Sequence, residues 1–405
     1  MKVKLYSLMV LLNSYLGGLL VPILSLLLMS KGISLSNLSI IMGIYAITVV
    51  FLELPTGVIA DVMGRKKTFC LSLLISLISS LVLLFGHGFI IMCVAMILFG
   101  LSRALSSGSF DALFIDSYIE AFGKDKLNRI TTRLAVLDSL GLSAGALSGG
   151  FFPEIKSNLF SNFGSYDLNI IIRIILTIIV LVLSIIFIKD ISTTENEERI
   201  PIKEHIKKSS SFVKGNLTVL CIFISAFATG FFLSALETYW QPHFISIMPN
   251  KSMMGLLGIM AFLYFVAAMS GGIISNKIID KYKLNLKSMY VVVRLLLAFI
   301  LILTAFQKNI FLFIIFYTMI YLMLGMANIP EAVILNGEIP NKIRASILSV
   351  NSLVMQLGGL AGSLVSSFLI SYISIPALWV VAGVVILISV LLTSKKLLVS
   401  KNDKE

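Results

Sequence analysis

The sequence has 405 residues, of which 58% are hydrophobic and 13% are charged, and its mean hydropathy is +1.01. A water-soluble domain is close to half apolar and a quarter charged, so this chain lacks the polar side chains that a surface in water requires. The composition excludes a soluble enzyme and a single-anchor protein. It predicts a chain that crosses the lipid bilayer many times.

Hydrophobic stretches separated by short polar turns predict twelve membrane-spanning helices, so the expected fold class is all-α. The alternating polarity that is typical of a membrane β-barrel does not occur in the sequence. Stretches longer than 25 residues indicate helices that are tilted or that emerge into water. The predicted spans are residues 5–29, 38–60, 68–86, 89–119, 134–152, 170–188, 216–246, 253–279, 288–306, 310–336, 345–371 and 377–393.

The net charge of +12 is explained by membrane topology. If the N-terminus lies in the cytoplasm, 25 of the 32 basic residues fall in the tails and cytoplasmic connections, and only four fall in the outside connections. Cytoplasmic loops of membrane proteins carry such an excess of Lys and Arg. We therefore expect both termini in the cytoplasm and no nucleic-acid partner.

A polar stretch at residues 189–215 divides the predicted spans into two sets of six. Landmarks recur across it at an offset of about 220 residues, including Pro22 with Pro242 and Asp61 with Asp280. Parallel repeats of this kind form two six-helix bundles related by an axis along the membrane normal, with a binding cavity between them. The expected parts are an N-terminal bundle (1–188), a cytoplasmic linker (189–215), a C-terminal bundle (216–393) and a cytoplasmic tail (394–405).

Ionisable side chains deep in a bilayer are costly and usually functional. Glu53 and Arg103 lie roughly 20 Å inside their predicted spans at the helical rise of 1.5 Å per residue. They belong either to a buried structural pair or to a proton-carrying site. Asp111 and Glu237, nearer to span ends, are further candidates for proton coupling. Two other arginines are expected to reach the interface through their long side chains: Arg173 and Arg294.

The turn between the second and third predicted spans reads G-x-x-x-D-x-x-G-R-K-K. The first glycine allows close helix approach, the aspartate can interact with a helix N-terminus, the second glycine permits a tight turn, and the arginine can form a forked contact to a carboxylate. This run resembles the loop signature of the major facilitator superfamily. The resemblance implies a cytoplasmic latch between the two halves, formed by Gly57, Asp61, Gly64, Arg65, Lys66 and, at the end of the fourth span, Asp116.

The corresponding loop of the second half keeps Asp280 but has Asn276 in place of the first glycine, so an asymmetric latch is expected. In span four, Arg103 followed by Gly108 resembles a family motif linked with proton coupling. In span five, the sequence resembles G-x-x-x-G-P-x-x-G-G of drug/proton antiporters, with Ala146 where that motif has proline. A glycine seam for helix packing is the alternative. The motif glycines are Gly141, Gly145, Gly149 and Gly150.

The segment from Glu53 to Lys66 also fits E-x-P-x5-D-x3-R-K. This pattern is similar to one found in a group of Gram-positive exporters that includes clostridial tetracycline-efflux proteins. The resemblance implies export as the direction of transport and the cell membrane of a bacterium as the location.

The seventh predicted span places Glu237 among aromatic side chains, followed by Pro242, which can break a helix. Aromatic faces beside a carboxylate suit amphiphilic cations, and methionine thioethers adapt to varied shapes. An interfacial aromatic belt or lipid-facing packing is the alternative. The predicted substrate cavity is lined by Phe231, Tyr239, Trp240, Tyr317, Tyr321 and Met323.

These patterns and the resemblance together predict a proton-coupled exporter of amphiphilic small molecules that works by alternating access. The expected partners are a small-molecule substrate, protons and the lipid bilayer, and the expected state is a monomer. A proton symporter that imports a sugar, peptide or other metabolite is one alternative, and a membrane enzyme or lipid-handling protein is another. The sequence has no phosphate-binding loop and no catalytic or metal-ligand spacing, so no enzymatic activity, cofactor or metal is expected.

Overall fold

A computed structural model describes residues 2–107, 109–110, 113–115, 127–155, 164–188, 215–249, 253–340 and 343–399. Within these ranges the chain forms helices joined by turns and no strand, which confirms the all-α prediction. Eleven of the described helical segments are long and apolar enough to cross a membrane. Because helices satisfy all their backbone hydrogen bonds internally, they are suited to lipid. The chain is a multi-pass membrane protein.

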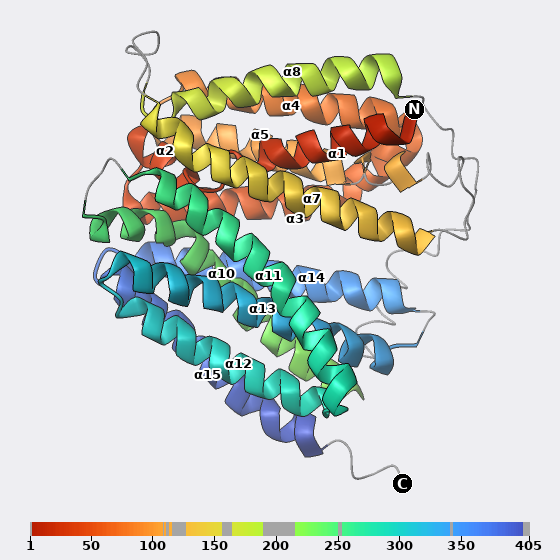
Figure 1. Ribbon diagram of the computed structural model, residues 1–405, viewed down its shortest axis with the longest axis vertical. Coiled ribbons are helices and arrows are strands. Elements are labelled where there is room, and N and C mark those ends of the chain that lie inside the picture. The colour runs from red at the N-terminus through yellow and green to blue at the C-terminus, as the bar shows by residue number, and fades with distance from the viewer. Residues whose placement is uncertain are drawn as a thin grey trace. The chain divides into compact units, whose positions relative to one another are not determined.

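The chain folds into two compact units (Figure 1). The first comprises Met1–Glu195 with Phe244–Phe262, and the second comprises Asn196–His243 with Leu263–Glu405. The described elements up to the linker are α1 (Lys2–Gly18), α2 (Leu24–Ser30), α3 (Leu35–Met63), α4 (Arg65–Phe85), α5 (Phe89–Ser107), α7 (Leu127–Phe151), the short 3₁₀ helix η2 (Phe152–Glu154) and α8 (Asp167–Phe187).

The described residues after the linker form six long helices, and the first two of them contribute to both units. Asparagine side chains begin two of the six, because Asn285 and Asn309 each accept backbone N–H groups of the first helical turn. The six helices are α10 (Leu217–Ile247), α11 (Gly255–Tyr282), α12 (Leu286–Ala305), α13 (Ile310–Glu338), α14 (Arg344–Leu369) and α15 (Ile375–Val399).

The first predicted span, residues 5–29, is two helices rather than one. Turns occupy residues 19–23, between α1 and α2. Pro22 lies in this break, where its ring supplies no N–H and disfavours helical backbone at Val21. The N–H of Val21 bonds instead to the carbonyl of Gly18, three residues earlier, at 3.0 Å. The prediction of one continuous helix is therefore wrong at this point.

Proline has the opposite outcome in α10, which continues through Pro242 to Ile247. The helix break predicted at Pro242 is therefore absent. Prolines also lie inside α3 and α13, at Pro55 and Pro330. Membrane helices tolerate proline because neighbouring groups and local adjustments satisfy the freed carbonyl.

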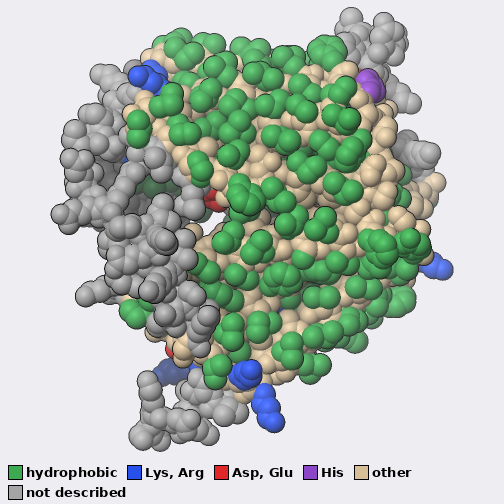
Figure 2. All heavy atoms as spheres, turned by 180° about the vertical axis from the view of Figure 1, so that it is seen from behind, with side chains coloured by type: hydrophobic (Ala, Val, Ile, Leu, Met, Phe, Trp, Pro, Cys, Tyr) green, Lys and Arg blue, Asp and Glu red, His purple; other side chains and the backbone are tan. Residues whose placement is uncertain are grey.

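Large apolar side chains remain exposed on the described helices, and they dominate the face seen in Figure 2. Phe85 is 72% exposed and Ile90 is 76% exposed. In water, an apolar surface of this extent would drive association. Lipid tails are as apolar as these side chains, so the same surface is compatible with a protein that lies in the bilayer.

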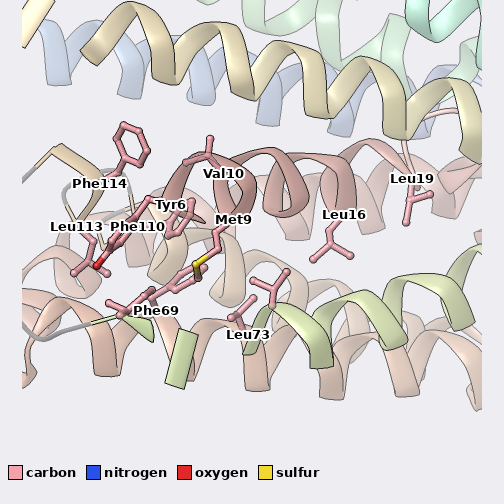
Figure 3. Packing of buried hydrophobic residues seen from close by; sticks show 12 residues of the cluster. Tyr6, Met9, Val10, Leu16, Leu19, Phe69, Leu73, Phe110, Leu113 and Phe114 are labelled. Carbon is pink, nitrogen blue, oxygen red and sulfur yellow. The ribbon is translucent and has the colours of Figure 1, made fainter. Parts of the chain in front are cut away.

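The core of the first unit lies where α1 meets α4 and the segment that follows α5 (Figure 3). The rings of Phe69 and Phe110 stack with centroids 4.2 Å apart, and Tyr6 meets Phe114 edge-on at 6.4 Å. In lipid, such contacts stabilise a helix bundle through van der Waals packing rather than through removal of apolar surface from water. This core fixes α1 and Phe110, which line the cavity described below.

A glycine seam joins α1 to α7 in the first unit. A Cβ atom added at Gly141 would lie 2.5 Å from the carbonyl oxygen of Leu11, so no larger residue fits there without moving a helix. Gly145 and Gly149 approach the backbone of the same segment even more closely. The backbones can approach because glycine has no side chain. Gly141, Gly145 and Gly149 therefore form a packing seam, whereas Gly150 packs against the backbone of Gly258 on the helix that spans Gly255–Tyr282; the role in antiport that the motif implies stays a prediction.

The second unit contains a matching seam between α10 and α14. A Cβ atom added at Gly358 or Gly362 would overlap the carbonyl oxygens of Phe227 or Phe231, respectively. The hydroxyl groups of Ser234 and Ser363 lie 2.7 Å apart across the same two helices. This recurrence of a glycine seam is consistent with the internal repeat predicted from the sequence.

Candidate functional site

A carboxylate lies within a cluster of aromatic side chains in the second unit. Glu237 of α10 is exposed, and its Oε1 accepts a hydrogen bond of 3.1 Å from the hydroxyl of Tyr321 on α13. The ring of Tyr264 on α11 stacks on that of Tyr321, with centroids 4.3 Å apart. Tyr317, one turn before Tyr321, has its ring centroid 5.9 Å from that of Tyr264. Two helices, α11 and α13, thus bring three tyrosines to one acidic group on α10.

Trp240, which follows Glu237 by three residues on α10, extends the cluster. Its ring lies 5.6 Å from that of Tyr317 and 6.4 Å from that of Tyr264, between centroids. His243, Phe313 and Trp379 continue the aromatic contacts, with ring centroids 4.9–5.8 Å apart. A carboxylate beside a continuous aromatic surface can bind an organic cation through charge and through cation–π contacts.

The six residues predicted to line a substrate cavity are all buried, and three of them belong to the aromatic cluster. Trp240, Tyr317 and Tyr321 belong to the aromatic cluster. Phe231 is buried, and its backbone carbonyl faces Gly362 at the α10–α14 seam. Tyr239 and Met323 are also buried.

The sequence interpretation missed Tyr264. It lies in an apolar stretch of α11 with no charged neighbour in the sequence. Its ring contacts Tyr321, which bonds to Glu237, because α11 packs on α13. A tyrosine at mid-span is the one sequence signal that could have indicated it.

A cavity of about 310 Å³ lies in the first unit between α1, α5 and α7. At its wall, the hydroxyl of Ser14 donates a hydrogen bond of 2.5 Å to Oδ1 of Asp138. Arg103 of α5 lines the same cavity. The cavity therefore contains a cationic and an anionic side chain together with hydroxyl groups.

Glu53 and Arg103 do not form the buried pair that the sequence left open. Both side chains are exposed, on α3 and α5 respectively. Neither forms an ion pair or a side-chain hydrogen bond with any residue that the structure describes. An exposed charge without a partner among the described residues is accessible to a ligand or a proton, so both residues stay candidates for function.

The predicted latch is described in part. Gly64 ends α3 and precedes α4 with φ of 93°, a backbone conformation that favours glycine, so the predicted tight turn is present. Lys66 Nζ donates to the carbonyl of Ile185 at 2.9 Å, and Arg65 is half-buried. At Gly57, an added Cβ would meet no described atom within 4 Å. The expected close helix approach at Gly57 is therefore wrong for the residues described.

Three acidic candidates lie wholly or partly outside the described part of the chain. Asp111 and Asp116 are outside it, and so is Gly108. Asp61 lies in α3, but its side chain is outside the description. Among the described residues, no group of three or more His, Cys, Asp or Glu could hold a metal ion.

The two arginines expected at the interface are instead buried. Arg173 donates through Nε to Ser80 and through Nη2 to Ser76, at 3.2 and 3.0 Å. Arg294 donates through Nη1 to Thr229 at 2.8 Å. Because groups inside the bundle accept hydrogen bonds from Arg173 and from both Nη atoms of Arg294, the side chains need not extend to water, and the prediction that they reach the interface is wrong.

Many described helices long enough to span a membrane, a cavity lined by both charges and a carboxylate within an aromatic cluster are together typical of a membrane transporter. The sequence profile described as the Major Facilitator Superfamily matches residues 6–282 and 218–405. The chain belongs to this superfamily, which confirms the resemblance recognised in the loop after the second predicted span.

Two relatives are similar in sequence. The MFS-type transporter YxaM of Bacillus subtilis (strain 168) is 23% identical over 404 residues, which cover 95% of this chain and 94% of that protein. The quinolone resistance protein NorA of Staphylococcus aureus (strain MRSA252) is 23% identical over 254 residues, which cover 61% of this chain and 62% of that protein.

Two solved structures share the fold. The nucleoside transporter NupG superposes with a TM-score of 0.80 at 13% identity, over 98% of this chain and 100% of that chain. A D-xylose-proton symporter superposes with a TM-score of 0.70 at 12% identity, over 96% of each chain. At these identities the likeness extends to the fold and not to the substrate.

Proposed function

We propose that the protein exports amphiphilic organic cations in exchange for protons, by alternating access across the bacterial cell membrane. The observation that carries the proposal is the exposed carboxylate of Glu237, bonded to Tyr321 within the aromatic cluster. A single carboxylate can hold a proton or neutralise a cation, but not both at once. This competition makes the entry of a proton release the substrate, which is the requirement for exchange.

The energy available to such an exchange is sufficient for export. A one-for-one exchange of a monovalent cation for a proton moves no net charge, so the pH gradient drives it. A gradient of one pH unit contributes about 1.4 kcal/mol per proton, which corresponds to about a tenfold concentration gradient of the substrate. Each further proton exchanged per substrate moves one net charge, and at 100 mV that charge adds about 2.3 kcal/mol. Glu53 and Asp111 are proposed as further proton carriers, and Asp61, Arg65 and Asp116 as the cytoplasmic latch.

The likeness to a quinolone resistance protein and the glycine motif of α7 support export of drug-like molecules. The second candidate is proton-coupled uptake of a metabolite, because the same fold also serves a D-xylose-proton symporter. The two candidates predict opposite directions of substrate movement under the same pH gradient.

Inside-out membrane vesicles with an acidic interior test the direction and the residue together. The proposal predicts that these vesicles accumulate ethidium, because protons that leave drive the cation inward. Glu237→Gln is expected to abolish accumulation, since an amide can neither take up a proton nor neutralise a cation. Glu53→Gln tests the second proposed carrier in the same assay.

Glu338→Gln is the matched control, because Glu338 lies at the end of α13, away from the aromatic cluster, where it forms a partly exposed ion pair with Lys287 and accepts a hydrogen bond from Asn216. Ethidium accumulation by this variant should equal that of the wild type. Failure of the wild-type vesicles to respond to the pH gradient contradicts proton exchange. Unchanged accumulation in Glu237→Gln contradicts the assigned site.

A further inference from the structure

The cavity of the first unit differs in chemistry from the aromatic cluster of the second. It lies within one unit, between α1, α5 and α7, and it encloses about 310 Å³. Apolar side chains that include Val10 and Phe110 line one part of it, and both belong to the packed core in Figure 3. The polar part of its lining consists of Asn13, Ser14, Arg103, Ser106, Ser107 and Asp138.

Two opposite charges line this cavity without neutralising each other. Arg103 forms no ion pair or side-chain hydrogen bond with any described residue. Asp138 accepts the hydroxyl of Ser14 and has no cationic partner within the described chain. Charged groups in a membrane protein usually pair with one another or face a ligand or water pathway. A cation and an anion that share a cavity but remain apart leave room for a ligand that contacts both.

The wall of the cavity is held in place by the α1–α7 seam. Gly141, three residues after Asp138, lies so close to α1 that an added Cβ would be 2.8 Å from Cβ of Ser14. The seam thereby fixes the register that brings the Ser14 hydroxyl to Asp138. A site on rigidly packed helices keeps its charged groups oriented before a ligand arrives, which lowers the entropic cost of binding.

We infer that this cavity binds the charged end of a zwitterionic amphiphile, with a carboxylate on Arg103 and a cationic nitrogen on Asp138. The guanidinium group offers the forked donors that match a carboxylate. A molecule with only one of the two charges can pair with only one of these side chains. The inference rests on the proposed function in that it names a substrate class for the same transporter.

Rhodamine B and its methyl ester test the inference, because they share one fluorophore and the ester lacks the carboxylate. The full-length protein is purified in detergent, and each dye is titrated by fluorescence anisotropy without any pH gradient. Arg103→Gln is expected to raise the Kd of rhodamine B about tenfold, through loss of a charge-assisted contact, and to leave the Kd of the ester within about twofold. Asp138→Asn should also weaken the binding of rhodamine B.

Two variants separate a binding role from a structural one. Arg133→Gln removes an exposed arginine of α7 that does not line the cavity, and it should change neither Kd. Arg103→Lys keeps the positive charge but loses the forked donors, so it should raise the Kd of rhodamine B about threefold or more and leave the Kd of the ester within about twofold, which tests the site even if Arg103→Gln fails to fold. An unchanged Kd in Arg103→Gln, an equal loss for both dyes, or no binding of rhodamine B to the wild type overturns the inference.

Transport of the two dyes distinguishes the inference from the proposed function. Vesicles that accumulate the ester under a pH gradient support cation export whether or not the cavity binds zwitterions. Binding of rhodamine B that depends on Arg103, in a protein that moves neither dye, retains the cavity and rejects proton-driven export. If Arg103→Gln transports neither dye but binds rhodamine B with an unchanged Kd, Arg103 is assigned to proton coupling and its role in binding is overturned.

Discussion

Lys31 and Asp167 are charged residues that the first unit buries, with exposures of 6% and 8%. Nζ of Lys31 lies 3.2 Å from Oδ1 of Asp167 and donates to the carbonyl of Leu84 at 2.7 Å. The backbone N–H of Gly164 donates to the other carboxylate oxygen at 2.8 Å. These bonds join the end of α2 to the end of α4 and the start of α8. The pair is therefore satisfied on both sides.

Lys31→Met is expected to destabilise the protein by about 3 kcal/mol or more, because it leaves a buried carboxylate without its cation. Thermal unfolding of the purified protein in detergent measures the effect as a lowered Tm. The double variant Lys31→Met with Asp167→Asn should recover part of the loss, since no unpaired charge remains.

Lys308→Met is the matched control for this prediction, because Lys308 is exposed in the turn before α13. It should change the free energy of unfolding by less than about 0.5 kcal/mol. A double variant no more stable than Lys31→Met alone would contradict the buried pair as the cause. Sequence reasoning counted Lys31 only as an outside charge, because its partner lies 136 residues away.

At the scale of helices, the glycine spacing in α7 predicted a smooth face, and the structure supplies its partner. The spacing could not identify α1 as that partner, because close approach depends on which helices are neighbours. The helix break near Pro22 could not be predicted for the same reason. The chain leaves the helix near Pro22, but α10 continues through Pro242, so a proline alone does not determine whether a membrane helix ends. The groups that surround the proline determine it.

Gly145→Ala and Gly362→Ala are expected to destabilise the first and second units by about 2 kcal/mol each, because each added methyl group overlaps a backbone carbonyl of the facing helix. The Tm of each purified variant in detergent measures the change. A separation of α1 from α7 would also displace Ser14 from Asp138, so Gly145→Ala should weaken rhodamine B binding while Gly362→Ala does not.

Gly337→Ala is the control for the seam. Gly337 lies near the end of α13, where an added Cβ meets no described atom within 4 Å. Alanine has the higher helix propensity by about 1 kcal/mol, so this variant should be as stable as the wild type or more stable. Equal destabilisation by all three substitutions would attribute the effect to glycine replacement in general rather than to the seam.

At the scale of the whole chain, composition and hydropathy were sufficient to predict an all-α protein with about twelve spans, and the loop motif to predict the family. The contacts of the side chains at the candidate sites could not be predicted in the same way. Glu237 and Tyr321 were both singled out, but their hydrogen bond joins residues 84 positions apart. The contact of Tyr264 and the pairing of Ser14 with Asp138 depend on helix neighbours that hydropathy does not encode.

Orientation in the membrane is the property of the whole chain that charge alone predicts. Four lysines lie in or beside the turn between α11 and α12, namely Lys277, Lys281, Lys283 and Lys287, whereas Lys308 is the one lysine in or beside the turn between α12 and α13. Cytoplasmic loops retain such positive charge, and α12, with 20 residues, is about 30 Å long and separates the two turns by the thickness of a bilayer. The first turn should therefore face the cytoplasm and the second should face outward.

Single cysteines in a background without Cys70, Cys93 and Cys221 test this orientation. A membrane-impermeant maleimide should label Lys308→Cys on intact cells, and it should label Leu284→Cys only after the membrane is permeabilised. Both positions are exposed in turns, so a difference in labelling reports the side of the membrane rather than burial. Labelling of Leu284→Cys on intact cells would show that this turn faces outward and would contradict the expected orientation. The pH gradient that drives export would then have to act in the opposite sense, so this measurement also fixes the direction in which the transport assay is interpreted.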